Sequence, residues 1–273
     1  IANLRATLGL DLPWSTQLVR YFAALLQGDM GRSLFQNEAV SAIIAARIGA
    51  TLELAMAALF VSIVIGVPLG ILAAMRKGTK VDTGLMLLAQ LGVSMPVYWL
   101  GELVNLITQS RLHDSVFSWV PPLGYVGLRE SPGQWALHLL FPWLTLAALY
   151  AGIYARVVRS EVLSAMDEDY VRTARAKGLT ERRILLRHAL RCSLIPVVSL
   201  FGLDFGALVG GSALLTEVVF GLPGVGKLTF DALQNLDLPV ILGCVLYAAF
   251  FVVLANAVVD LVYALLDPRV RRG

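Results

Sequence analysis

Long hydrophobic runs separated by short polar segments dominate this chain. Five of these runs contain about 20 residues or more with few charges, which is enough for an α-helix to cross about 30 Å of hydrocarbon. We predict spans at residues 51–75, 84–109, 135–158, 194–219 and 239–265. The runs are continuous and do not alternate with polar residues, which argues against a membrane β-barrel. The predicted fold class is therefore an all-α, polytopic membrane helical bundle.

Composition agrees with a membrane bundle. Hydrophobic residues make up 58% of the 273 residues and charged residues 15%, whereas soluble domains carry about 25% charge. The net charge of +3 is typical of charged loops in a membrane protein, and we predict no nucleic-acid binding. Cys192 and Cys244 form no Cys-x-x-Cys motif, and His113, His138 and His188 lack metal-ligand spacing. The sequence therefore indicates neither a disulfide framework nor a metal site.

Basic residues are distributed unequally between the two sides of the predicted spans. The loops on the C-terminal side hold 15 of the 22 lysines and arginines. The positive-inside rule then predicts that the loop at 160–193 and the tail at 267–273 are cytoplasmic. Residues 1–50 and the loop at 220–238 are predicted to be external, with a transmembrane domain at 51–266. An external N-terminal segment requires one more span upstream, which we expect to precede residue 1.

The N-terminal segment carries a weak amphipathic pattern. Leu18, Tyr21, Phe22 and Leu25 fall at helical spacing, and a turn-prone run follows at 28–31. The pattern predicts an external helix that lies on the bundle or on the membrane surface.

The loop at 160–193 contains a strongly charged helical segment. Acidic residues stand at its start and basic residues near its end, as the helix dipole favours; these are Asp167, Glu168, Asp169, Arg175 and Lys177. Gly178 is a typical helix-ending residue, and Thr180 is a candidate cap for a second helix over 181–191. A structured, water-exposed element between two spans favours docking of a soluble partner. The alternative is a solvated loop that only satisfies the charge rule.

This loop resembles the cytoplasmic EAA loop of ABC-importer permeases in the dipeptide, oligopeptide and nickel transport family. The resemblance rests on Thr173-Ala174-Arg175-Ala176-Lys177-Gly178-Leu179, Arg187-His188-Ala189-Leu190-Arg191 and Leu194-Ile195-Pro196. The general pattern is Glu-Ala-Ala, three residues, Gly, nine residues and Ile-x-Leu-Pro. Here Arg172-Thr173-Ala174 and His188-Ala189-Leu190-Arg191 replace its two ends, as in peptide-type members.

Three further segments extend the resemblance to nearly the whole chain: Ala50-Thr51-Leu52-Glu53-Leu54-Ala55, Glu217-x-x-Phe220-x-x-Pro223-Gly224-x-Gly226 and Leu266-Asp267-Pro268-Arg269. The chain is most similar to the first of the two permease subunits in such importers. The resemblance implies the type I ABC importer permease fold, with five spans here and a sixth upstream.

The resemblance also implies partners in the cell (inner) membrane. The chain would pair with a second homologous permease subunit, dock on cytoplasmic ABC ATPase subunits and receive peptides from an extracytoplasmic substrate-binding protein. The ATPase subunits would bind ATP and Mg²⁺, so that this chain would need no cofactor and would not be an enzyme.

The family's coupling residues carry over to one short segment. By resemblance, the contact with the ATPase would involve Tyr170, Thr173, Ala174, Arg175, Ala176, Lys177, Gly178 and Leu179. Ala174 and Gly178 would be packing and turn positions, while Arg175 and Lys177 would make polar contacts.

Small and polar residues within the predicted spans suggest further roles. Small residues at four-residue spacing let helices approach closely, and Gly202, Gly206 and Gly210 would pack either within this bundle or against the second permease subunit. Ionisable and amide groups at membrane depth need a polar neighbour or a cavity. Candidates for the translocation pathway or a gate are Glu102, Asn105, Asp204 and Glu217. Glu53 and Glu217 lie near external helix ends and are expected to hold those ends or a gate.

The segment from Gly221 to Lys227 matches the Gly-x₄-Gly-Lys core of a phosphate-binding loop. A Ser or Thr should follow to bind Mg²⁺, but Leu228 stands there, and no strand is predicted before it. The predicted external position is also away from cytoplasmic ATP. We interpret the segment as a turn that leads into a short external helix.

Two other function classes remain as alternatives. In an ion- or proton-coupled secondary carrier, Asp204 and Glu102 would titrate with transport, and uptake would survive the loss of any ATPase. An intramembrane enzyme would need a catalytic pair, which we do not find. The residues do not select among dipeptides, oligopeptides, glutathione, nickel chelates and haem-like substrates.

Overall fold

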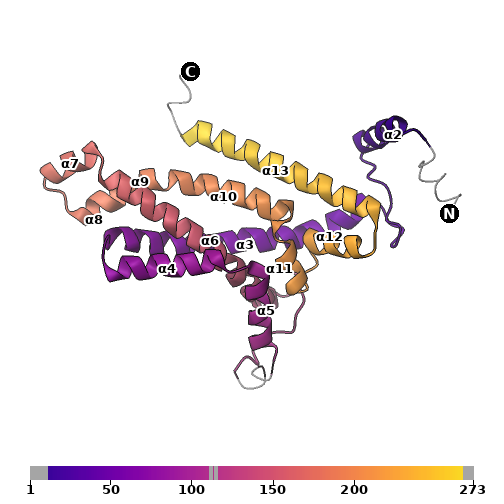
Figure 1. Cartoon of the computed structure of the whole chain (residues 1–273), viewed down its shortest axis with the longest axis horizontal. Coiled ribbons are helices and arrows are strands. Elements are labelled where there is room, and N and C mark those ends of the chain that lie inside the picture. Colours follow the sequence, from indigo (N-terminus) through magenta and orange to yellow (C-terminus); the bar gives the residue numbers. More distant parts are fainter. Residues whose placement is uncertain (1–11, 111–112, 114–115, 267–273) are drawn as a thin grey trace.

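The structure is a computed structural model that describes residues 12–110, 113 and 116–266. Within these ranges the regular structure is helical, apart from a β-bridge between Arg32 and Ala39. The helices form an elongated bundle, with α7 and α8 at one end and α12 with the first turns of α13 at the other (Figure 1). In chain order the elements are α2 (Trp14–Leu26), α3 (Val40–Met75), α4 (Lys80–Ser94), α5 (Val97–Thr108), α6 (Pro132–Met166), α7 (Asp169–Ala176), α8 (Glu181–Ile184), η1 (Leu185–Ala189), α9 (Leu190–Ser193), α10 (Ile195–Ala207), η2 (Leu208–Ser212), α11 (Leu214–Val219), α12 (Val225–Gln234) and α13 (Leu238–Leu266).

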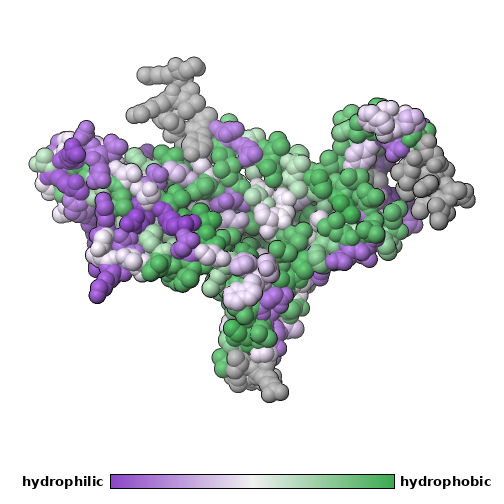
Figure 2. Space-filling model, in the orientation of Figure 1, coloured by the Kyte–Doolittle hydropathy of each residue, from purple (hydrophilic) through white to green (hydrophobic). Residues whose placement is uncertain are grey.

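Length and hydropathy identify four continuous spans and one broken span among the described residues. The continuous spans are α3, α6, α10 with η2, and α13, while α4 and α5 pass the test together. The prediction of an all-α membrane bundle is therefore confirmed. Figure 2 shows hydrophobic residues over the middle of the bundle and hydrophilic residues gathered at the end that holds α7 and α8.

The predicted span at 84–109 is wrong as a single helix. The axes of α4 and α5 differ by 94°, and the break falls at Met95 and Pro96. Proline has no N–H and disfavours the helical conformation of the residue before it. Accordingly, Met95 has an extended backbone with ψ 129, and Pro96 becomes the N-cap of α5.

The predicted span at 194–219 is also interrupted. It consists of α10, the π-helical η2 and the short α11, with the break at Gly211. Gly211 has φ +123, a conformation that glycine adopts without the steric cost that a Cβ would bring. The segment after this glycine therefore runs in a new direction.

The predicted N-terminal boundary at residue 50 is too far along the chain. Helix α3 begins at Val40 and has 36 residues, so it is about 54 Å long and exceeds the hydrocarbon thickness by about 24 Å. The predicted amphipathic helix is confirmed as α2, in which no residue is fully buried. The predicted loop at 220–238 contains α12, and the tail at 267–273 lies outside the described residues.

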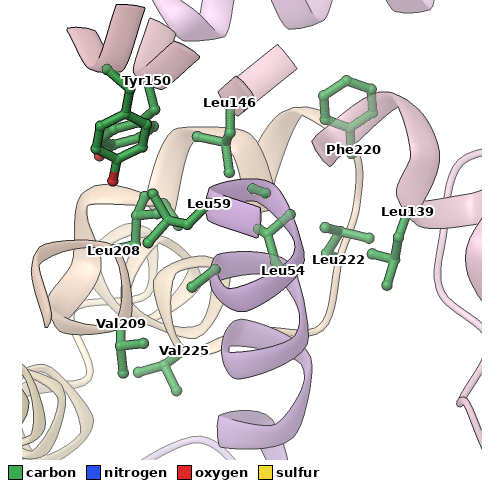
Figure 3. Close-up of a cluster of buried hydrophobic side chains, with 14 of the residues drawn as sticks. Leu54, Leu59, Leu139, Leu146, Tyr150, Leu208, Val209, Phe220, Leu222 and Val225 are labelled. Carbon is green, nitrogen blue, oxygen red and sulfur yellow. The ribbon is translucent and has the colours of Figure 1, made fainter. Parts of the chain in front are cut away.

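Close contact between α3 and α6 forms the centre of the bundle. A Cβ on Gly66 would lie 2.7 Å from the Ala151 carbonyl oxygen, and one on Gly70 would lie 2.5 Å from the Ala155 carbonyl oxygen. Glycine is therefore required for the backbones to approach this closely. Around this contact, Leu54 and Leu59 of α3 lie in the same buried cluster as Leu146, Leu208 and Phe220 (Figure 3).

An ion pair fixes α4 against α6. The Arg159 guanidinium donates to both carboxylate oxygens of Asp82, at 2.6 and 2.7 Å. Asp82 is 4% exposed, and its carboxylate also accepts from the Gly78 amide at 3.0 Å. This two-pronged geometry is specific for arginine and holds the first turn of α4 in place.

The glycine stripe of α10 packs against α13 of the same chain. A Cβ on Gly202 or Gly206 would overlap Val259 or Ala255, and one on Gly210 would lie 2.8 Å from Val252 Cγ2. The first alternative, packing within one bundle, is therefore what the structure shows. The predicted contact of these glycines with a second subunit is not observed, because α13 occupies their face.

Replacing Gly70 by Ala tests the α3–α6 contact. The new methyl group would meet the Ala155 carbonyl and the Val158 side chain, so we expect a loss of about 1–3 kcal/mol in unfolding free energy. Gly49→Ala is the matched control, because it lies in the same helix with no atom within 4 Å of its Cβ; there helix propensity predicts a neutral or slightly stabilising effect. Thermal unfolding of both variants in one detergent measures the difference, and equal midpoints would contradict the proposed role of Gly70.

Candidate functional site

The charged loop folds into a helical hairpin. Helix α6 ends at Met166 with Asp167 as its C-cap, and α7 begins at Asp169 after Glu168, so Asp167 does not start α7 as predicted. The helix ends at Gly178, which has φ +79, and the amides of Gly178 and Leu179 donate to the Arg175 and Ala174 carbonyls at 2.9 and 3.2 Å. The predicted glycine turn is confirmed.

The hairpin has a small hydrophobic core of its own. Val171 and Ile184 are fully buried and Ala174 is 7% exposed, with Met166 and Leu179 packed against them. The predicted packing position of Ala174 is therefore seen within the hairpin. The next turns carry Leu185 and Ala189 into the main core of the bundle. A force on α7 can thus be transmitted through packed side chains to the spans.

An ion pair closes the hairpin. The Arg175 guanidinium donates to the two Glu181 carboxylate oxygens at 2.7 and 3.2 Å. The hydrogen bond from Arg175 lowers the pKa of the Glu181 carboxyl, so the pair stays ionised at neutral pH. Arg175, predicted to contact another protein, instead has a partner within the hairpin in this structure.

The outward face of the hairpin remains exposed. Tyr170 is 40% exposed, and the other exposed coupling candidates on and just after α7 are Thr173, Ala176 and Lys177. This face is polar, yet the small core and the Arg175–Glu181 pair fix its shape. It has the properties of a surface that binds another protein through a preformed helix.

The opposite end of the bundle holds a fully buried carboxylate. Glu217 of α11 is 1% exposed and accepts hydrogen bonds from Thr51 Oγ1 at 2.7 Å and the Lys227 amide at 2.9 Å. Thr51 Oγ1 in turn accepts from the Val225 amide at 2.9 Å. We call this set of contacts the Glu217 clasp. It joins α3, α11 and α12, and it agrees with the prediction that Glu217 holds a helix end.

The clasp explains the motif that resembles a phosphate-binding loop. A helix N-terminus favours a negative charge because its amides are free to donate, and here the Glu217 carboxylate supplies that charge to α12. A Cβ on Gly224 would overlap this carboxylate, and one on Gly226 would lie 3.0 Å from Glu217 Oε2. The two glycines therefore make room for the chain's own carboxylate, and the element before them is the helix α11.

A second carboxylate joins α3 to α6 near the same end. Glu53 Oε2 accepts from the Tyr125 hydroxyl at 2.7 Å and from Trp135 Nε1 at 2.6 Å. Burial, and then the hydrogen bond to Glu53, raise the pKa of Tyr125 to about 12. The phenol therefore remains a donor at neutral pH. Glu53 was expected to hold a helix end, and these are the groups that it holds.

The four pathway candidates do not form one cluster. Asn105 Nδ2 donates to the Val219 carbonyl at 3.0 Å, which places Asn105 beside the α11 segment that carries Glu217. Asp204 accepts from the Tyr154 hydroxyl at 2.8 Å, between α10 and α6. Glu102 is exposed on α5, and the described residues give it no hydrogen bond or ion pair. Because Glu217 is enclosed by the clasp, it does not face an open pathway in this structure.

Sequence reasoning missed the partners of these carboxylates. Thr51 lies 166 positions from Glu217, and Asp82 lies 77 from Arg159. Spacing along one helix carries no information on such pairs. The only local signal was the Gly-x-Gly spacing before α12, which indicated that something approaches the backbone there.

Comparison with known proteins places the chain in a family. The family described as "Binding-protein-dependent transport system inner membrane component" matches residues 66–272. A peptide transport system permease protein of Brucella abortus (strain 2308) is 40% identical over 99% of this chain and 84% of its own length. The dipeptide transport system permease protein DppB of Escherichia coli (strain K12) is 36% identical over 99% of this chain and 85% of its own length.

Solved structures share the fold at lower identity. An inward-facing crystal form of the MetNI methionine ABC transporter superposes with a TM-score of 0.63 and 18% identity, covering 82% of this chain and 96% of the matched chain. An amino acid ABC transporter crystallised with histidines gives a TM-score of 0.53 at 17% identity, covering 81% and 92%. The helices described above therefore form the permease fold of these importers, and the chain belongs to the family of binding-protein-dependent transport system inner membrane components.

Proposed function

We propose that the chain is the transmembrane subunit of an ATP-driven peptide importer and forms half of the translocation pathway with a second, homologous permease subunit. The observation that carries this proposal is the similarity over 99% of the chain to permeases named for peptide and dipeptide transport. The dipeptide and oligopeptide classes are therefore favoured over the other substrates that the sequence left open.

The α7–α8 hairpin is the proposed docking element for a cytoplasmic ABC ATPase subunit. Its exposed face is preformed, and its small core continues into the bundle through Leu185 and Ala189. Movement of the ATPase subunits, which bind ATP and Mg²⁺, would then be passed to α6 and α10 by direct packing. In this proposal the chain itself hydrolyses nothing.

The orientation follows from the distribution of charge. The hairpin end carries the excess of lysine and arginine, and these residues face the cytoplasm in most inner-membrane proteins. The C-terminus and the hairpin are then cytoplasmic, and the Glu217 clasp lies on the outer side. A substrate-binding protein would deliver peptide to that outer side.

Alternating access needs places where the spans can bend. Two such places are present, the 94° break at Pro96 and the break at Gly211. Hinges are commonly a few residues at the ends of elements that absorb changes in φ and ψ. We propose that closure of the ATPase subunits moves the hairpin and that α5 and α11 change their angles to the bundle at these points.

ATP dependence is the first test. In proteoliposomes that contain the complete importer and its binding protein, uptake of a labelled dipeptide should require ATP inside the cytoplasmic compartment. It should stop when the catalytic site of the ATPase subunits is inactivated. Uptake that continued on a proton gradient without ATP would instead favour a proton-coupled carrier.

Replacing Gly178 by Val tests the coupling hairpin. The residue has φ +79 with no atom within 4 Å of its Cβ, so the effect arises from backbone strain of about 1–2 kcal/mol and not from a clash. We expect transport to fall at least tenfold while ATP hydrolysis by the assembled complex continues. Gly28→Val is the matched control, because Gly28 has φ +80 and equally open surroundings. Full transport by Gly178→Val would contradict the proposed coupling role.

Reversing the charge of Lys177 tests the polar contact. Lys177 is exposed and lies just after α7, so Lys177→Glu should leave the bundle folded and weaken ATPase binding about tenfold, or about 1.4 kcal/mol. Arg129→Glu, also exposed but in the segment before α6, is the control. The amount of ATPase that co-purifies with each variant is the measurement, and equal amounts would count against a contact at Lys177.

A further inference from the structure

A group of large apolar side chains is exposed at the end of the molecule opposite α7. The segment after α2 and the last turns of α12 meet there at the start of α13 (Figure 1). Exposure of these side chains ranges from 47% to 78%. We call them the Leu236 patch: Leu34, Phe35, Leu233, Leu236 and Leu238.

A buried carboxylate holds the two halves of the patch together. Asp237 is 4% exposed and accepts hydrogen bonds from the Ser33 hydroxyl and, at 3.2 Å, from the Leu34 amide. Ser33 Oγ also accepts from the Gln36 amide at 2.9 Å, which shapes a tight turn around Leu34 and Phe35. The exposed side chains on either side of Asp237 are therefore displayed on a fixed backbone.

The backbone of Leu236 is strained. It has φ +56, a conformation that is costly for leucine and much easier for glycine, asparagine or aspartate. Its side chain is 78% exposed, so burial within this chain does not offset the cost. Strained residues of this kind cluster at functional sites, because the surrounding structure holds them there for a use.

The patch lies beyond the membrane. Residues 54–75 of α3 carry no charge and are followed by Arg76 and Lys77, which places the hydrocarbon layer along this stretch. From Leu54 to Val40 the helix continues for about 21 Å, and even at a tilt of 40° it rises about 16 Å. The headgroup layer is only about 5–8 Å thick on each side. The turn at Ser33, which precedes Val40, is therefore in water.

We propose that the Leu236 patch is the docking surface for the external substrate-binding protein, an inference that rests on the proposed function. Exposed apolar side chains in water, held rigidly and rimmed by polar residues, are typical of a protein interface. The exposed rim is formed by Arg32, Glu38 and Asp231. The family is dependent on a binding protein, and the patch is on the side of the bundle away from the proposed ATPase contact.

The test uses the complete importer in nanodiscs with its purified peptide-binding protein, loaded with a dipeptide. Leu236→Asp and Phe35→Asp remove exposed apolar surface, and Asp tolerates the backbone of Leu236 better than Leu does. The readout is the concentration of binding protein that gives half-maximal stimulation of ATP hydrolysis. We expect this concentration to rise at least tenfold in each variant, with basal hydrolysis and subunit assembly unchanged.

Leu128→Asp is the matched control, because Leu128 is 44% exposed and lies in the segment before α6, outside the patch. Stimulation at the wild-type concentration by both patch variants would overturn the inference and leave the proposed function intact. Loss of subunit assembly would overturn it as well, by assigning the patch to the second permease. A wild-type complex that the loaded binding protein does not stimulate would overturn the proposed function and this inference with it.

Discussion

The close approach of α3 and α6 is the contact on which the rest of the structure depends. Lipid tails are as apolar as leucine, so helices in a membrane associate through close packing and hydrogen bonds more than through burial of apolar surface. Gly66 and Gly70 let the two backbones touch, and the other elements are attached to this pair. Helix α4 is joined to α6 by Arg159, α10 by Tyr154, and α12 is joined to α3 by Thr51.

The polar attachments share one design. A carboxylate from a neighbouring element accepts hydrogen bonds from donors that only one arrangement of helices provides, as Asp82, Asp204 and Glu217 show. An unpaired carboxylate at low dielectric would cost several kcal/mol, so a displaced helix would lose its partner and gain that cost. The apolar contacts bring the helices together, while these pairs determine which faces meet. The Glu217 clasp applies the same rule to a helix N-terminus.

The sequence predicted the number of spans and the hairpin well, because both depend on local patterns. Continuous apolar runs set the spans, and acid-first, base-last order with Gly178 set α7 and its turn. The breaks were harder, since Pro96 was visible but the 94° angle depends on packing of α5 against α11. The clasp was out of reach for a different reason. Glu217 and Thr51 belong to different helices, and nothing in either local pattern names the other.

The same arrangement explains how the two ends of the molecule can influence one another. Helix α6 has 35 residues and is about 52 Å long, so it reaches from the hairpin to the Trp135–Glu53 contact near the other end. The hairpin core meets α6 at Met166, and Asp204 ties α10 to α6 at Tyr154. Rigid elements with defined contacts carry coupling only if other parts can yield. The breaks at Pro96 and Gly211 are those parts, and both lie outside the α3–α6 pair. A displacement of α7 would therefore move α6 as a lever, while α5 and α11 adjust around it.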